Sequence, residues 1–177
     1  MKTISEEYRR EQIKLHENPH YGVASVEFAP MVAEIISHSA PKTVTDYGAG
    51  KLRLKSTLDS LGVTDYQYQP FDPAYPAYGD AQEADLVCCI DVLEHIEPEL
   101  LDNVLIDLAR VTKNIGFFTI HMGPAAKVLS DGRNAHLIQK PTSWWLPRLC
   151  QHFEIGNLQT HKVFGQGFLV VVSPKFA

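Results

Sequence analysis

What the chain lacks narrows its function before any motif is considered. No stretch approaches the roughly 20 apolar residues of a membrane span, and the N-terminus has no signal-peptide core. The net charge of −5 gives no general attraction for nucleic acid. The three cysteines are more typical of small apolar side chains that fill the core in a reducing compartment than of a disulfide framework. We therefore expect a soluble cytoplasmic protein without a membrane partner.

The remaining composition is that of an ordinary globular domain. The chain has 177 residues, of which 45% are hydrophobic and 21% charged, enough for one full core. No repeat, linker or low-complexity tract divides it. We expect a single domain over 1–177, with an N-terminal helical cap over 1–38 and a core over 42–172. The oligomeric state is not predicted.

Apolar periodicity predicts alternating strands and helices in the core. The segment 70–84 contains three prolines and several small residues, so it predicts a loop in which a regular third strand is hard to find. Strands are expected near 43–45, 66–69, 86–90, 116–120, 153–155 and 168–172, and helices near 51–61, 98–112 and 142–152. Alternation followed by two closing strands predicts an α/β sandwich with a mostly parallel sheet.

Acids and glycines occur where the first two strands are expected to end. Gly48 and Gly50 permit a tight bend and let a ligand touch backbone N–H groups at a helix N-terminus. Asp46 precedes them and can accept from a ligand ammonium or order the loop. Asp72 follows the second strand, where a carboxylate commonly accepts hydrogen bonds from a ribose diol. This order predicts a nucleoside site at the carboxyl edge of the sheet.

A third informative segment is Asp85–His95. It contains a continuous apolar run, which predicts a buried strand, and it ends in polar side chains. Together with Asp46–Gly50 and Phe71-Asp72, it resembles the class I S-adenosylmethionine-dependent methyltransferases, including small methyltransferase-like proteins of bacteria and phages. The resemblance covers about residues 20–172. It implies a Rossmann-like three-layer sandwich with a mostly parallel seven-stranded sheet, an antiparallel C-terminal strand and, here, a shortened third strand.

The resemblance also implies a cofactor, S-adenosylmethionine, and the residues that would hold it. His20 and Tyr21 either close over the cofactor as an N-terminal lid or form a turn packed against the first core helix. By position, Asp46 and the two glycines would hold the methionine half and Asp72 the ribose. The cofactor-binding candidates are Tyr21, Asp46, Gly48, Gly50, Asp72, Ile90 and Asp91.

Two positions depart from the family pattern. Leu52 stands where the family often has a third glycine, so the loop must be less open or the cofactor must sit slightly away from it. The acid-bearing third strand that usually orients the adenine is shortened, and Asp80 is its only candidate. Both departures leave open whether the domain is catalytically competent.

A second polar cluster consists of Asp91, Glu94 and His95. In the ubiquinone-pathway O-methyltransferases and the small-RNA 2′-O-methyltransferases, a similar segment helps to bind a divalent metal, and His136 would complete such a site here. Many methyltransferases keep Glu-His at this place without a metal. The alternative is a capped, solvated loop at the start of the next helix, and a metal is not favoured.

Two histidines that follow the strand near 116–120 are candidates for proton transfer. His121 and His136 lie on loops at the ligand-binding edge, where an imidazole could take a proton from a hydroxyl or amine. A dedicated base is optional, because positioning carries most of the reaction of an already reactive sulfonium.

These observations predict a methyltransferase that acts on a small polar acceptor, such as a sugar or nucleotide. One alternative is a non-catalytic cofactor- or partner-binding module with a reduced pocket. A second is a nucleic-acid methyltransferase, which Arg133, Lys140 and Arg148 would fit but the acidic balance opposes. An NAD-dependent oxidoreductase is disfavoured, because Arg53 replaces the last glycine of Gly-x-Gly-x-x-Gly.

Overall fold

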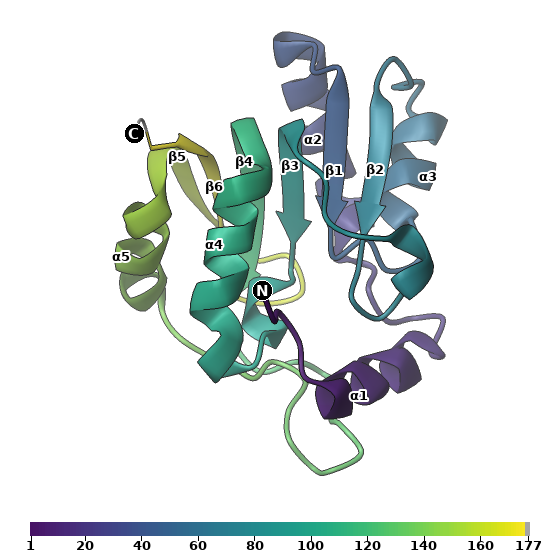
Figure 1. Cartoon of the computed structure of the whole chain (residues 1–177), viewed down its shortest axis with the longest axis vertical. Coiled ribbons are helices and arrows are strands. Elements are labelled where there is room, and N and C mark those ends of the chain that lie inside the picture. Colours follow the sequence, from purple (N-terminus) through teal and green to yellow (C-terminus); the bar gives the residue numbers. More distant parts are fainter. Residues whose placement is uncertain (176–177) are drawn as a thin grey trace.

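A computed structural model describes residues 1–175 and shows helices packed on both faces of one sheet (Figure 1). The helices are α1 (Glu6–His16), α2 (Ala24–Ser39), α3 (Arg53–Ser60), α4 (Leu101–Val111) and α5 (Thr142–His152). The strands are β1 (Thr43–Tyr47), β2 (Gln67–Phe71), β3 (Ala84–Ile90), β4 (Thr112–His121), β5 (Phe153–His161) and β6 (Gly167–Pro174). Short 3₁₀ turns cover Pro76–Tyr78, Leu93–His95 and Pro98–Leu100. Over residues 1–175, no helix has the length and apolar character needed to cross a membrane.

The sheet has the strand order β2-β1-β3-β4-β6-β5. Strands β1 to β4 are parallel to their neighbours, whereas β6 runs antiparallel to both β4 and β5. This confirms the expected mostly parallel sheet with an antiparallel C-terminal pair. Because β1 and β2 are parallel and Tyr47 pairs with Phe71, Asp46 and Asp72 lie at the same edge of the sheet.

The prediction of seven strands was wrong, since the described residues form a sheet of six. No separate strand forms between β2 and β3. That segment turns through Pro73 and a 3₁₀ helix that begins at Pro76 instead. Proline has no backbone N–H, so it cannot donate the hydrogen bonds that would pair a further strand with β2. Strand β2 is therefore the outermost strand on this side of the sheet. Pro70 is tolerated inside β2 because the strand is an edge strand.

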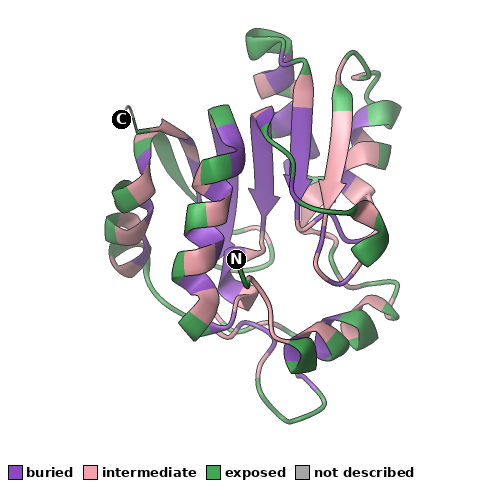
Figure 2. Ribbon diagram, in the orientation of Figure 1, coloured by how far each residue is buried: buried purple, intermediate pink, exposed green. Residues whose placement is uncertain are grey.

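Each face of the sheet has its own hydrophobic core. Helices α2 and α3 pack on one face through Phe28, Val32 and Leu54, and α4 and α5 pack on the other through Leu105 and Trp145. Figure 2 shows the central strands buried between these layers, with the outer sides of the helices exposed. Of the two adjacent tryptophans, Trp145 is fully buried and Trp144 lies at the edge.

The cysteines divide in the same way. Cys88 and Cys89 are fully buried in β3, as expected of apolar filler, whereas Cys150 is exposed on α5. The prediction of apolar filler was therefore wrong for Cys150, because its position on α5 faces away from the sheet while Leu149 faces the core.

The N-terminal helix α1 is separate from these layers. It lies across the carboxyl ends of the strands, toward which the arrowheads of β1, β2 and β3 point (Figure 1). Glu11 accepts hydrogen bonds from the Ser130 N–H at 2.8 Å and the Ser130 hydroxyl at 2.7 Å. Glu97 accepts from the Ser5 N–H at 2.7 Å. These contacts hold α1 against the loop over 122–141 and the start of α4, so the strand ends face a covered space.

Candidate functional site

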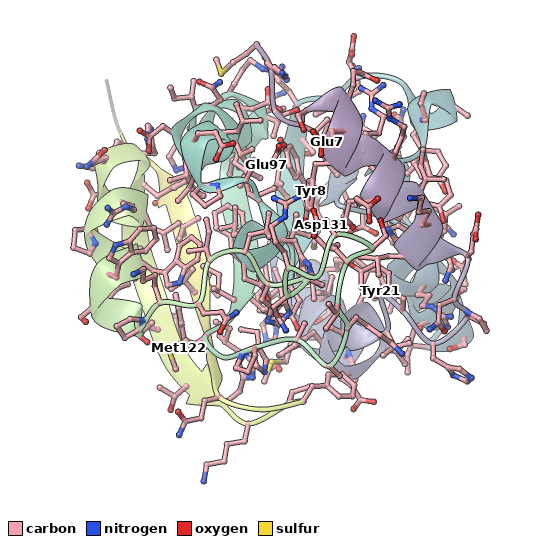
Figure 3. The ribbon with its side chains drawn as sticks, turned by 90° about the horizontal axis from the view of Figure 1, so that it is seen from below. Glu7, Tyr8, Tyr21, Glu97, Met122 and Asp131 are labelled. Carbon is pink, nitrogen blue, oxygen red and sulfur yellow. The ribbon has the colours of Figure 1, made fainter. Side chains whose placement is uncertain are left out.

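A cavity of about 410 Å³ lies between the strand ends and helix α1. Its walls come from the loops after β1, β2, β3 and β4, from the N-terminal segment and from the loop over 122–141. Figure 3 looks at this side of the molecule and shows α1, with Tyr8, beside the loop that carries Asp131. The residues predicted from the sequence that line the cavity are Tyr21, Asp46, Gly48, Gly50, Asp72, Ile90, Asp91, His95, His121 and His136.

The glycine bend after β1 requires glycine for steric reasons. Gly48 has a φ of +90° and Gly50 a φ of +48°, which are left-handed conformations that favour glycine. A Cβ on Gly48 would also come within 2.3 Å of a methyl carbon of Val92. The N–H groups of Gly48 and Ala49 donate to the Phe71 carbonyl at 2.8 and 3.0 Å, which joins the bend to the end of β2.

Asp72 completes the connection between the bend and β2. Its Oδ2 accepts from the Gly50 N–H at 2.9 Å, and its Oδ1 accepts from the Ala74 N–H at 2.8 Å. Burial raises the pKa of Asp72, and these two backbone hydrogen bonds oppose that shift. Each carboxylate oxygen keeps a second lone pair, so both can still accept from a ligand at the cavity wall.

Asp46 is the most deeply buried acid at this end of the cavity, with 3% of its surface exposed. Its carboxylate accepts a hydrogen bond from the Tyr68 hydroxyl. Burial raises the pKa of Asp46 to about 7, although the Tyr68 hydrogen bond opposes this. Near neutral pH the side chain therefore exchanges a proton readily, and a cation beside it would favour its ionised form.

Asp91 is held in a constrained backbone conformation just after β3. Its φ is +51°, an uncommon value for a residue other than glycine. Thr119 on β4 fixes it from both sides: the Thr119 hydroxyl accepts from the Asp91 N–H at 2.9 Å and donates to Asp91 Oδ1 at 2.6 Å. Ile90 and Asp91 thus form the wall of the cavity beside the glycine bend.

Leu52, at the position of the family's third glycine, adopts a left-handed φ of +59° as the residue before α3. The loop therefore has the backbone geometry that glycine would adopt freely, at a strain cost of about 1–2 kcal/mol for leucine. Asp80 is exposed and does not line the cavity, so the interpretation of Asp80 as the adenine-orienting acid was wrong. The turn without a third strand points this side chain to solvent.

The N-terminal segment contributes Tyr21 and His16 to the cavity. The Tyr21 hydroxyl donates to Gln12 at 3.1 Å and lies 3.4 Å from Nδ1 of His95, which places it inside the cavity. Sequence reasoning missed His16, whose ring packs edge-on against Tyr21 and Tyr75 with centroids 5.0 and 5.2 Å away. Its Nδ1 is buried and has no hydrogen-bond partner in the part of the chain that the structure describes.

Position next to the glycine bend explains the environment of His16. Its Cε1 would lie 3.0 Å from a Cβ on Gly50, so the ring sits directly over the bend. Burial lowers the pKa of His16, an effect that nearby Asp72 opposes. No local pattern in α1 marked this residue, because only the docking of α1 brings it to the site.

Three imidazoles gather at the other end of the cavity. The ring of His136 lies 4.6 Å from that of His95 and 4.9 Å from that of His121, measured between centroids. Both nitrogens of His121 are engaged: Nδ1 accepts from the Gly123 N–H at 3.1 Å, and Nε2 lies 3.1 Å from the Phe164 carbonyl. His136 uses Nδ1 to contact the Gly123 carbonyl at 2.7 Å. Of the two predicted bases, only His136 retains a free nitrogen.

Glu94 lies behind these rings and is fully buried. Its Oε1 accepts from the backbone N–H of His121 at 2.8 Å, whereas Oε2 has no hydrogen-bond partner within residues 1–175. Burial, reinforced by the charge of Asp91, raises the pKa of Glu94. Burial and the neighbouring His136 lower the pKa of His95 to about 3. Both shifts indicate a place where uncompensated charge is costly.

The basic residues that suggested a nucleic-acid site lie elsewhere. Arg133 pairs with Asp131 at 2.6 Å, and Arg148 stacks on Trp144 at 3.6 Å from the ring centroid. Among the described residues, Lys127 is the one lysine or arginine that lines the cavity. The cavity therefore offers no basic track for a nucleic-acid backbone.

Comparisons with solved structures identify the architecture. The protein superimposes on 1,6-didemethyltoxoflavin-N1-methyltransferase from Burkholderia thailandensis, crystallised with 1,6-didemethyltoxoflavin and S-adenosylhomocysteine, with a TM-score of 0.67 and 16% identity over 99% of this chain and 92% of that one. The chain has the class I methyltransferase fold.

Two further methyltransferases share that fold, each with S-adenosylhomocysteine bound. Magnesium protoporphyrin IX methyltransferase from Synechocystis PCC 6803 matches with a TM-score of 0.59 and 13% identity, over 94% of this chain and 93% of that one. The N-methyltransferase NodS from Bradyrhizobium japonicum WM9 matches with a TM-score of 0.59 and 8% identity, over 96% and 99%. No protein-family model matches the sequence, and no curated protein does.

Proposed function

We propose that this protein is an S-adenosylmethionine-dependent methyltransferase that acts on a small polar acceptor. The observation that supports it most is the pairing of Asp72 with the glycine bend at the wall of a covered cavity. A carboxylate at the end of the second strand, beside a glycine turn, suits a nucleoside whose ribose diol donates hydrogen bonds. The methyltransferase fold adds independent support for this class of cofactor.

The ribose, the ammonium and the adenosyl group of the cofactor would each lie beside a suitable group at this end of the cavity. The two spare lone pairs of Asp72 would accept from the ribose hydroxyls, with His16 above them. The ammonium of the methionine half would pair with Asp46, whose raised pKa it would lower again. Ile90 and Asp91 would border the adenosyl group, and Tyr21 would close the cavity from the N-terminal side.

The end of the cavity lined by His95, His121 and His136 would take the methyl acceptor. The cavity of about 410 Å³ is at the small end of the range of roughly 300–1,000 Å³ for ligand sites, which favours a small acceptor, such as a sugar or nucleotide, over a large one. In the transfer, a lone pair of the acceptor heteroatom bonds to the methyl carbon. The electron pair of the broken S–C bond returns to sulfur, and the acceptor proton passes to water. Holding the two groups in line supplies most of the catalysis.

Calorimetry with S-adenosylhomocysteine tests the cofactor site. We expect Asp72→Asn to weaken binding by about 100-fold, since it removes a charge-assisted acceptor pair while keeping the side-chain size. Asp80→Asn, which changes an exposed acid in the same loop, should leave binding unchanged. Circular dichroism would verify that both variants are folded.

Unchanged affinity in a folded Asp72→Asn variant would refute this placement of the cofactor. Activity is tested separately, by measuring S-adenosylhomocysteine formed from S-adenosylmethionine in the presence of sugar and nucleotide acceptors. Binding of the cofactor without any turnover across such a panel would instead support the non-catalytic binding module.

A further inference from the structure

Two of the imidazoles at the acceptor end have their tautomers set by the backbone. Nδ1 of His95 lies 2.8 Å from the Ala135 carbonyl, and Nδ1 of His136 lies 2.7 Å from the Gly123 carbonyl. A carbonyl only accepts, so each Nδ1 must carry the proton and donate it. In a neutral imidazole, the proton on Nδ1 leaves a lone pair on Nε2. Both rings therefore present an acceptor nitrogen rather than a donor.

Glu94 adds a third acceptor close to these two residues. The side chain is fully buried, and the backbone N–H of His121 donates to Oε1, which leaves Oε2 without a hydrogen-bond partner among the described residues. A buried carboxylate oxygen without a partner is strongly unfavourable until a proton, a water molecule or a cation satisfies it. One ligand atom from each of Glu94, His95 and His136 can be chosen so that all lie within 4.8 Å of one another.

We propose that Glu94, His95 and His136 bind a divalent first-row metal ion such as Zn²⁺. Two histidines and one glutamate form a ligand set that zinc uses where a fourth position stays open for water or substrate. The hydrogen bonds from the two Nδ1 atoms to backbone carbonyls are the outer contacts that orient metal-binding imidazoles. A cation bound between the three side chains would satisfy the unpartnered Glu94 oxygen, since each residue offers a ligand atom within 4.8 Å of the others.

Asp91 does not belong to this ligand set, although the sequence placed it among the metal candidates. Its Oδ1 accepts from the Thr119 hydroxyl at 2.6 Å, and the converging group consists of the other three residues. His121 is excluded as a ligand because both of its ring nitrogens are occupied. Its backbone N–H donates to the Glu94 carboxylate and fixes it. These contacts make Thr119 and His121 supports of the site rather than ligands.

The metal site deepens the proposed function and depends on it for its role. His95 and His136 both line the cavity, so an open fourth position would face the space assigned to the acceptor. A zinc ion there would bind a hydroxyl oxygen and make its proton easier to lose. The acceptor class that this favours is a small molecule with a reacting hydroxyl group.

Zinc titration of the full-length, metal-stripped protein tests the ligand set. The measurement is calorimetry in a Cys150→Ser background, because the exposed thiol of Cys150 could bind zinc by itself. We expect one site per chain, with affinity reduced about tenfold or more by Glu94→Gln and by His136→Gln. His38→Gln, which alters an exposed histidine on α2, should bind zinc as the background protein does.

Cobalt substitution tests the open position. Co²⁺ in a four-coordinate site with histidine ligands gives visible absorption bands, and we expect them to shift when acetohydroxamate, a small oxygen-donor probe, is added. Glu94→Gln should lose the bands while retaining its circular dichroism spectrum. Absence of a stoichiometric site, or zinc binding that neither variant weakens, would overturn the proposal.

Failure of the metal proposal can be told apart from failure of the proposed function. Both titrations are performed without S-adenosylmethionine, so zinc binding does not depend on the cofactor. Cofactor binding that requires Asp72, together with no zinc site, would refute the metal alone. A zinc site in a protein that does not bind S-adenosylhomocysteine would refute the methyltransferase assignment and leave the ligand set intact.

Discussion

The two ends of the cavity differ in how their polar groups are satisfied. At the glycine-bend end, the acids face donors: Asp72 accepts from the N–H groups of Gly50 and Ala74, and Asp46 accepts from Tyr68. At the imidazole end, Glu94 and His136 present lone pairs that no protein donor meets. The two acids at the first end therefore have donors as soon as the chain has folded, whereas Nδ1 of His16 above the bend has no partner within residues 1–175. The acceptors at the second end need a proton, a water molecule or a cation from outside the chain.

This difference follows from how each end is assembled. The bend and Asp72 lie at the ends of two neighbouring parallel strands, so strand register alone brings them together. The imidazole end combines the 3₁₀ turn Leu93–His95, the end of β4 at His121, and His136 from the loop over 122–141. A loop that is anchored by backbone contacts can orient acceptors toward one point, which a sheet edge by itself does not do.

The largest expected effect concerns the proton on Asp46. Its pKa is raised from an ordinary value of 3.8 to about 7, so it favours folding below pH 4 and loses that contribution as the pH rises through 7. Relative to Asp46→Asn, the free energy of unfolding of the ligand-free protein should fall by up to about 1.4 kcal/mol per pH unit in this range. Denaturant unfolding between pH 4 and 8 measures it. Parallel pH profiles for both proteins would contradict the burial argument.

A smaller effect is expected from adding a side chain to the glycine bend at Gly48. Gly48→Ala would place a Cβ 2.3 Å from Val92, whereas Gly132→Ala, at an almost identical φ of +89°, has nothing within 4 Å. Both variants share the conformational strain, so their difference isolates the collision. We expect Gly48→Ala to lower the free energy of unfolding by about 1–3 kcal/mol more than Gly132→Ala does, and to weaken the binding of S-adenosylhomocysteine. Equal losses in thermal unfolding would show that Val92 yields freely.

The smallest effect separates two buried glutamates in the metal-free protein. Glu94 has an unpartnered oxygen, while Glu97, 8% exposed, accepts from the Ser5 N–H at 2.7 Å. Glu94→Gln should stabilise the metal-free protein at pH 8 by about 1 kcal/mol, because it removes the unpaired charge and adds donors for the imidazoles. Glu97→Gln should destabilise it slightly. Chemical denaturation after chelator treatment distinguishes these outcomes, and a destabilising Glu94→Gln would weaken the contrast between the two ends.

Local patterns predicted the parts of the molecule that depend on neighbours in sequence. The buried run in β3, the helical spacing in α4 and the glycines after β1 correctly predicted these elements and the bend between β1 and α3. The prolines predicted the loop between β2 and β3 correctly, whereas the shortened third strand that the resemblance implied does not form there. His16 was missed because α1 carries no motif, and its contact with Gly50 arises only from docking.

The amino-acid sequence by itself determined the α/β architecture and the glycine bend, because hydrophobic periodicity and backbone sterics act between residues close together in the chain. It also determined that Asp46 and Asp72 share one edge, since parallel strands bring their carboxyl ends together. The tertiary structure decided which lone pairs converge. The backbone carbonyls of Ala135 and Gly123 set which nitrogen of His95 and His136 carries the proton, and burial leaves one Glu94 oxygen without a partner among the described residues. Both features arise only when segments distant in sequence pack together.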